Sequence, residues 1–104
     1  MKNFLRTFLL AALACVAACG TAPPVQEMSD ARQAITVAKQ AGAKEFAAFH
    51  LRAAEAYLAS AEKSLGVRAY NQARGDAQQA KMKALDALKA VEDLAEDAAA
   101  AGDD

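Results

Sequence analysis

The sequence predicts an all-α fold of three helices, in which a short first helix packs on a long antiparallel, alanine-rich helical hairpin. Two features of residues 19–104 support this prediction. The segment holds 25 alanines, no tryptophan and few large aliphatic side chains, a composition that favours helix strongly and sheet hardly at all. Apolar residues also recur at alternating intervals of four and three, which is the heptad spacing of helices that pack side by side.

A first helix is predicted over residues 29–41. Ser29 or Asp30 offers a side-chain oxygen that can cap the helix N-terminus, and Gln33 follows Asp30 at the interval of a capping box. Gly42 suits the position just beyond the C-terminus, where glycine adopts a left-handed conformation at least cost. The predicted apolar face consists of Ala31, Ala34, Ile35, Ala38 and Ala41.

The predicted hairpin consists of two longer helices joined by a short turn after Gly66. The seam of the second helix holds Ala47, Leu51, Ala54, Leu58, Ala61 and Leu65, and that of the third holds Ala73, Ala77, Ala80, Ala84, Ala87, Val91, Leu94 and Ala98. Because both seams repeat every 3.5 residues, they can face each other along their length. The short turn makes the two helices antiparallel.

The third helix can run from about residue 69 to residue 100, whereas the second covers about 19 residues, or ~28 Å at 1.5 Å per residue. About ten residues at the C-terminal end therefore lack a partner within the chain. The acids of this end are Glu92, Asp93, Glu96, Asp97, Asp103 and Asp104, and no basic residue follows Lys89. Since like charges four residues apart repel and acids oppose the helix dipole there, we expect fraying. We interpret this whole acidic end as solvated, in preference to a docking site for a basic partner, because charge runs usually serve solubility. Residues 101–104 are predicted to be its acidic tail.

The N-terminal residues have the organisation of a secretory signal peptide, predicted to span residues 1–18. Lys2 and Arg6 form a positively charged start, and an uninterrupted apolar run of 11 residues follows over 8–18. A run of this length is typical of a signal and too short for a bilayer core that takes about 20 residues to cross. The helical domain proper is predicted over residues 29–100.

The segment Val16-Ala17-Ala18-Cys19 closes this signal and resembles the lipobox of bacterial lipoproteins, which are cut immediately before the cysteine. The resemblance implies three acyl chains on Cys19, the predicted lipid attachment site. One myristoyl chain already binds a membrane reversibly, so three make an effectively permanent anchor. Residues 19–28, with Gly20 and two prolines, are predicted to be a lipidated, extended tether.

Two alternatives to this anchor are an unmodified Cys19 with cleavage elsewhere and lipidation at Cys15, whose preceding residues fit a lipobox less well. If the chain comes from a Gram-negative bacterium, an aspartate directly after the lipidated cysteine would favour the inner membrane. Gly20 stands there instead. We therefore expect a lipid anchor in the periplasmic face of the outer membrane.

Composition argues against several classes of function. Without residues 1–18 the chain carries 10 basic and 13 acidic residues, and this negative balance argues against a nucleic-acid partner. With Cys19 acylated, no thiol remains for a disulfide or a metal site. His50, the one histidine, has alanines three and four residues ahead, so the pattern predicts no metal ligand pair, no catalytic residues and no cofactor.

Two further groups of residues have an ordinary structural interpretation. Glu55 and Glu62 lie seven residues apart, and the nearby Arg52 and Lys63 favour a solvated charged stripe over a carboxylate pair. The aromatic residues are expected to fill core volume, with ligand stacking as the less favoured alternative. They are Phe46, Phe49, Tyr57 and Tyr70.

Most of the segment resembles an uncharacterised alanine-rich lipoprotein domain family of Gram-negative envelopes. The resemblance lies in Met28-Ser29-Asp30-Ala31-Arg32, Ala54-Glu55-Ala56-Tyr57-Leu58, Ala61-Glu62, Gly66, Tyr70, Ala73-Arg74 and Ala77-Gln78-Gln79-Ala80. The family pattern often has proline where Ala48 stands here. Members are small lipoproteins or precede a peptidoglycan-binding domain, which this chain lacks, and the family implies no activity.

The leading hypothesis is a non-enzymatic, membrane-anchored structural or protein-interaction module of the periplasm, which binds another envelope protein or itself. The alternative is a carrier for a lipid or other hydrophobic ligand, with a loose alanine core that opens for an apolar guest. The second hypothesis predicts a ligand-dependent rise in melting temperature.

Overall fold

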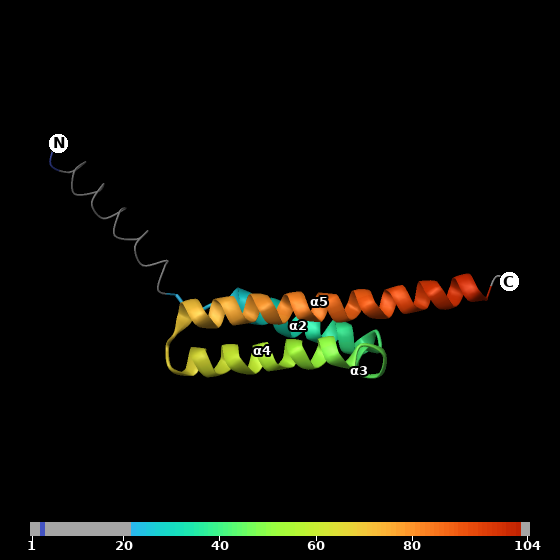
Figure 1. Ribbon diagram of the computed structural model, residues 1–104. Helices are drawn as coiled ribbons and strands as arrows, with labels where there is room; N and C mark the ends of the chain where they lie inside the picture. Colours follow the sequence, from blue (N-terminus) through green and yellow to red (C-terminus); the bar gives the residue numbers. More distant parts are fainter. Residues whose placement is uncertain (1–2, 4–21, 103–104) are drawn as a thin grey trace.

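The computed structural model describes Asn3 and residues 22–102, and residues 22–102 form four helices. These are α2 (Val25–Gln40), α3 (Ala43–Phe46), α4 (Ala48–Gly66) and α5 (Tyr70–Ala101). The described residues include no strand, so the predicted all-α class is confirmed. Figure 1 shows α2 and α4 lying along α5, with α3 at the end where α2 gives way to α4. The hairpin predicted from the heptad seams is α4 with α5, and the predicted first helix is α2.

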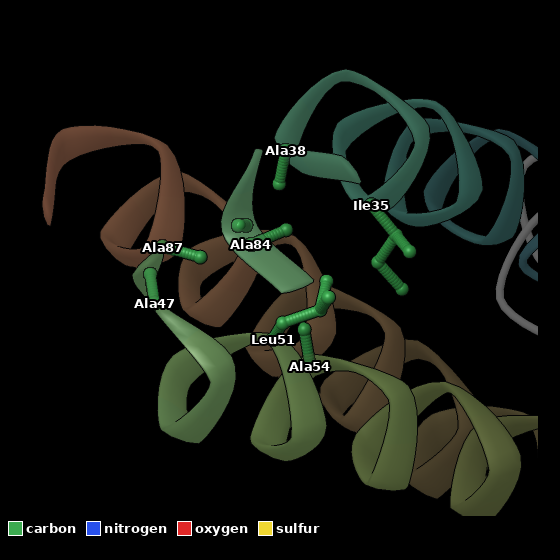
Figure 2. Close-up of a cluster of buried hydrophobic side chains, with 8 residues drawn as sticks. Ile35, Ala38, Ala47, Leu51, Ala54, Ala84 and Ala87 are labelled. Atoms are coloured by element: carbon green, nitrogen blue, oxygen red, sulfur yellow. The ribbon is translucent and has the colours of Figure 1, made fainter. Parts of the chain in front are cut away.

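Two hydrophobic clusters hold the helices together. One joins Met28 and Ala31 of α2 to Ala61 of α4 and to Ala77 and Ala80 of α5. The other consists of Ile35, Ala38, Ala43, Ala47, Leu51, Ala54, Ala84 and Ala87, and Figure 2 shows Ile35 and Leu51 pointing into the space between their helices. Later residues of α2 thus meet earlier residues of α4 and later residues of α5. The helix α4 is therefore antiparallel to both of its neighbours.

The predicted alanine seam of α5 is confirmed over most of its length. Its first five members are completely buried, namely Ala73, Ala77, Ala80, Ala84 and Ala87. A methyl side chain fills little space, so alanine at these positions lets neighbouring backbones approach closely. Val91 is half-buried, and Leu94 and Ala98 are exposed. The seam continues in sequence beyond the point where the described helices cover it.

The first long helix starts at Val25, four residues before its predicted start, and neither Ser29 nor Asp30 caps it. The Met28 amide donates a hydrogen bond to the Pro24 carbonyl at 3.0 Å, and Asp30 accepts one from the Gln26 side chain at 2.9 Å. The prediction of an extended tether to residue 28 is wrong for residues 25–28. The physical reason is the burial of Met28 in the core, which stabilises an additional helical turn. The predicted apolar face began at Ala31 and did not include Met28.

A break at Ala47 separates α3 from α4 and was not predicted. The backbone of Ala47 has φ −145° and ψ 43°, so the helix is interrupted there and restarts at Ala48. Ala48 is thus the first residue of α4, a position that also suits proline. Ala43 and Ala47 are both buried in the core cluster. The single turn of α3 therefore packs on the bundle and does not simply extend α4.

The two predicted turn glycines behave differently. Gly42 has φ +100° and its amide bonds to the Lys39 carbonyl at 3.0 Å, as predicted for the residue beyond a helix end. Gly66 ends α4 as predicted, but the left-handed residue is Arg68, with φ 62°. The Arg68 amide bonds to the Leu65 carbonyl at 3.1 Å, and the next amide bonds to the Ser64 carbonyl at 2.8 Å. This pair of bonds is the Schellman motif, here with arginine where glycine is usual.

Candidate functional site

An apolar groove at the C-terminal end of the bundle is the best candidate for a binding surface. Its volume is about 360 Å³, and every residue that lines it is apolar: Ala41, Phe46, Val91, Leu94, Ala95 and Ala98. One wall comes from the end of α2 and from α3, and the other from the last turns of α5. This groove, called here the α5 groove, is the place where the seam of α5 loses the cover of α4.

The local backbone explains why Phe46 stands at the rim of this groove. After the left-handed Gly42, the amides of Glu45 and Phe46 both bond to the Gly42 carbonyl at 3.1 Å, which closes the single turn of α3. Ala43 and Ala47 face the core, and Phe46 stays 61% exposed. A large ring on a one-turn helix is thus left at the surface beside α5.

The opposite wall is the part of α5 from Val91 to Ala101, called here the overhang. Leu94 is 49% exposed, and the other residues from 92 to 101 are exposed too. At the base of the overhang, Lys89 donates a hydrogen bond to Asp93 at 3.1 Å. That bond, with the charges of Asp93, Glu96 and Glu92, raises the pKa of Lys89 above its ordinary value of 10.5. The negative charge of the overhang is therefore only partly balanced.

A second, charged cavity of about 500 Å³ lies over the start of α4. Its lining residues are Lys39, Lys44, Ala48, Leu51, Arg52 and Glu55. Lys39 pairs with Glu55 at 3.0 Å, and both side chains are about half exposed. Ion pairs with this exposure contribute on the order of 0 to 1 kcal/mol. The cavity is an open surface depression lined by solvated charges.

The acidic residues of α4 have partners that the sequence did not reveal. Glu62 accepts from Arg32 at 3.4 Å, and Glu55 pairs with Lys39, so both cations come from α2 and not from Arg52 or Lys63. Arg74 of α5 likewise pairs with Glu27 of α2 at 3.3 Å. Glu55 and Glu62 are about half exposed, in keeping with the expected solvated charged stripe. The register between helices decides which cations they meet.

The other residues singled out in the sequence do not gather at one place. Cys19, the predicted lipid site, and the signal residues lie outside the described residues. His50 is half-buried on α4 and meets Phe49 edge to face, with ring centroids 5.6 Å apart. Phe46 and Phe49 are 61% and 80% exposed, and Tyr57 is exposed as well, so the expectation that the aromatics fill the core is wrong for these three. Tyr70 is half-buried. Alanine methyl groups fill the closely spaced helix interfaces and leave no room for rings there.

Two structural features are absent from the part of the chain that the structure describes. Within Asn3 and residues 22–102, no group of three or more histidine, cysteine, aspartate or glutamate side chains is placed to hold a metal ion. None of the helices in this part of the chain combines the length and hydropathy of a membrane span.

No protein-family model, no curated protein and no solved structure matches this chain. The resemblance to alanine-rich envelope lipoproteins therefore stays a prediction.

The sequence pattern predicts one wall of the α5 groove, on the last turns of α5, but not the opposite wall at Phe46. The heptad seam that outlasts its partner helix predicts an uncovered apolar face at Leu94 and Ala98. Phe46 was missed as a rim residue because the break at Ala47 carries no Gly or Pro signal. A contact between α3 and α5 also joins segments that are far apart in the chain.

Proposed function

We propose that this chain is a lipid-anchored protein of the bacterial envelope whose helical domain acts as a non-enzymatic protein-interaction module in the periplasm. The observation that carries the proposal is the lipobox-like segment Val16-Ala17-Ala18-Cys19 at the end of a secretory signal. Acylation of Cys19 tethers the domain, and Gly20 favours transfer to the outer membrane of a Gram-negative host.

The shape of the described domain supports an interaction role. Arg74 donates a hydrogen bond to the Ala22 carbonyl at 3.3 Å, so the chain enters the bundle beside the first turns of α5. The overhang lies at the opposite end of the same helix (Figure 1). From Arg74 to Ala101 the distance along the axis is ~40 Å. An anchor just before Ala22 thus leaves the α5 groove far from the point of attachment.

A second candidate function is transport or storage of a hydrophobic ligand, and the apolar lining of the α5 groove favours it. The groove volume, about 360 Å³, falls within the range of small-molecule sites. A fatty acid such as palmitate, used as the probe, would then raise the melting temperature in proportion to the logarithm of its concentration. An interaction module shows no such rise.

The first test is the intact mass of the protein isolated from the membranes of its host. We expect the mass of residues 19–104 plus three acyl chains, and its loss in a Cys19→Ala variant. The matched control is Cys15→Ala. Residue 15 lies in the signal that is removed, so this variant should have the same mature, lipidated mass as the unaltered protein. An unmodified mass for the unaltered protein, or lipid retained in Cys19→Ala, would refute the anchor.

A further inference from the structure

The α5 groove is an apolar surface bordered by negative charge. Residues three apart on a helix differ by about 60° around its axis. Glu92 therefore lies beside Ala95 at one edge of the apolar stripe, and Asp97 lies beside Leu94 at the other edge. Asp93 and Glu96 lie on the back of the same helix, and all four acids are exposed. The overhang is thus amphipathic, with apolar groove residues between acidic borders.

The described residues cover this stripe only in part. Val91 is half-buried, but Leu94 and Ala98 continue the seam as exposed residues, and no residue of α4 lines the groove around them. Ala41 and Phe46 line one side of the groove and leave the other side open. The stripe has the heptad spacing of the buried part of α5, so its geometry suits another helix.

Charge decides which helix fits. In the described segment 90–102 the charged side chains are Glu92, Asp93, Glu96 and Asp97, and none is basic. A second copy of the chain would bring a second set of the same acids to the interface, and like charges in contact disfavour association. Two overhangs of about ten residues would also bury far less than the ~1,200 Å² typical of a stable dimer. A helix with basic borders gains attraction at both edges of the stripe.

We propose that the α5 groove binds a basic amphipathic helix of another protein, which lays its apolar face on Phe46 and Leu94 and its cations beside Glu92 and Asp97. The proposal rests on the interaction role proposed above and names the class of partner for it. This mode of recognition places an amphipathic helix in a preformed groove. The acidic borders also disfavour anionic lipid as the occupant.

The test uses a synthetic amphipathic helical peptide of leucine and lysine, with a leucine and glutamate peptide of the same apolar pattern as its control. The protein is used as isolated from its host, in zwitterionic lipid nanodiscs if it is lipidated and free in buffer if it is not. Empty discs give the background. We expect binding of the lysine peptide by fluorescence anisotropy, and an affinity at least about tenfold lower for the glutamate peptide.

Matched variants locate the binding. Phe46→Gln is expected to weaken binding of the lysine peptide by about tenfold or more, whereas Phe49→Gln, at an even more exposed ring on the next helix, leaves it unchanged. Glu92→Gln with Asp97→Asn lowers the affinity and its salt dependence, and Glu45→Gln with Asp86→Asn is the control of equal charge change. Circular dichroism establishes that each variant retains its helices and melting temperature.

Three outcomes would overturn the proposal. Equal affinity for the lysine and glutamate peptides would show that the acidic borders do not select a basic helix. An equal loss of affinity for the lysine peptide in the Phe46→Gln and Phe49→Gln variants would show that the peptide does not bind in the α5 groove. Sedimentation that shows self-association abolished by Leu94→Gln would make a second copy the occupant. The intact mass is measured independently, so failure of the groove and failure of the lipid anchor are distinguishable.

Discussion

At the scale of single residues, two backbone positions determine how the helices α2 and α4 end. Gly42 and Arg68 both adopt left-handed conformations, with φ of +100° and 62°, and both lie at the end of a long helix. Glycine adopts this conformation without steric cost, whereas a residue with a Cβ loses about 1 to 2 kcal/mol. Gly75 is different, because it lies inside α5 and an added Cβ would meet no atom within 4 Å.

Arg68→Gly is expected to stabilise the protein by roughly 0.5 to 1 kcal/mol, because glycine removes the strain of the left-handed turn and keeps both Schellman hydrogen bonds. The free energy of unfolding in urea measures the effect. Val67→Gly is the control, since Val67 has φ −100° and gains nothing from glycine. A loss of stability in Arg68→Gly would show that the arginine side chain stabilises the turn.

Gly75→Ala and Gly42→Ala are expected to change stability in opposite directions. Alanine at position 75 raises helix propensity in open space, which stabilises by roughly 1 kcal/mol. Alanine at position 42 is strained at φ +100° and places its Cβ 3.3 Å from the Phe46 ring, so it destabilises by on the order of 1 kcal/mol or more. Thermal unfolding of the two variants checks both signs. Destabilisation by Gly75→Ala would show that a neighbouring element approaches α5 closely at this position.

At the scale of elements, α5 has two parts with different environments. Its alanine seam is fully buried from Ala73 to Ala87, and its residues from 92 onward are exposed. Packing of an apolar face supplies most of the stability of a helix in a protein. The overhang has little such packing, its acids repel one another, and they lie at the end of the helix where the dipole disfavours them.

Amide hydrogen exchange rates are expected to differ between the buried part of α5 and the overhang. Amides of residues 77–87 open only with most of the bundle and should exchange slowly, while those of residues 95–101 should exchange faster by at least about a hundredfold, which corresponds to a difference of ~2.7 kcal/mol in opening free energy. Nuclear magnetic resonance of the native protein resolves the two sets. Uniform protection along α5 would mean that the overhang is covered in solution.

At the scale of the whole molecule, packing outweighs the ion pairs that link α2 to its neighbours. The pairs Arg32–Glu62 and Lys39–Glu55 involve side chains that are about half exposed, and water screens such pairs strongly. Ile35, by contrast, is buried in the cluster that joins the helices. The core is rich in alanine, so each of its few larger side chains provides an unusually large share of the buried area.

Ile35→Ala is therefore expected to lower the free energy of unfolding by roughly 2 to 4 kcal/mol, while Glu62→Gln lowers it by less than about 1 kcal/mol. Urea unfolding followed by circular dichroism measures both. Because all four described helices share this cluster, the transition of the unaltered protein should be a single step. Equal effects of the two variants would contradict the dominance of packing.

The amino-acid sequence by itself determined the helical class, the two long seams and the glycine turn at residue 42. These features depend on local propensity and on the heptad period, both of which are properties of neighbouring residues. Tertiary structure decided the early start of α2 through the burial of Met28, the break at Ala47 and the pairing of Glu55 and Glu62 with cations of α2. It also decided that Phe46 meets the end of α5. These outcomes depend on contacts between segments far apart in the chain, and periodicity within one segment carries no information about such contacts.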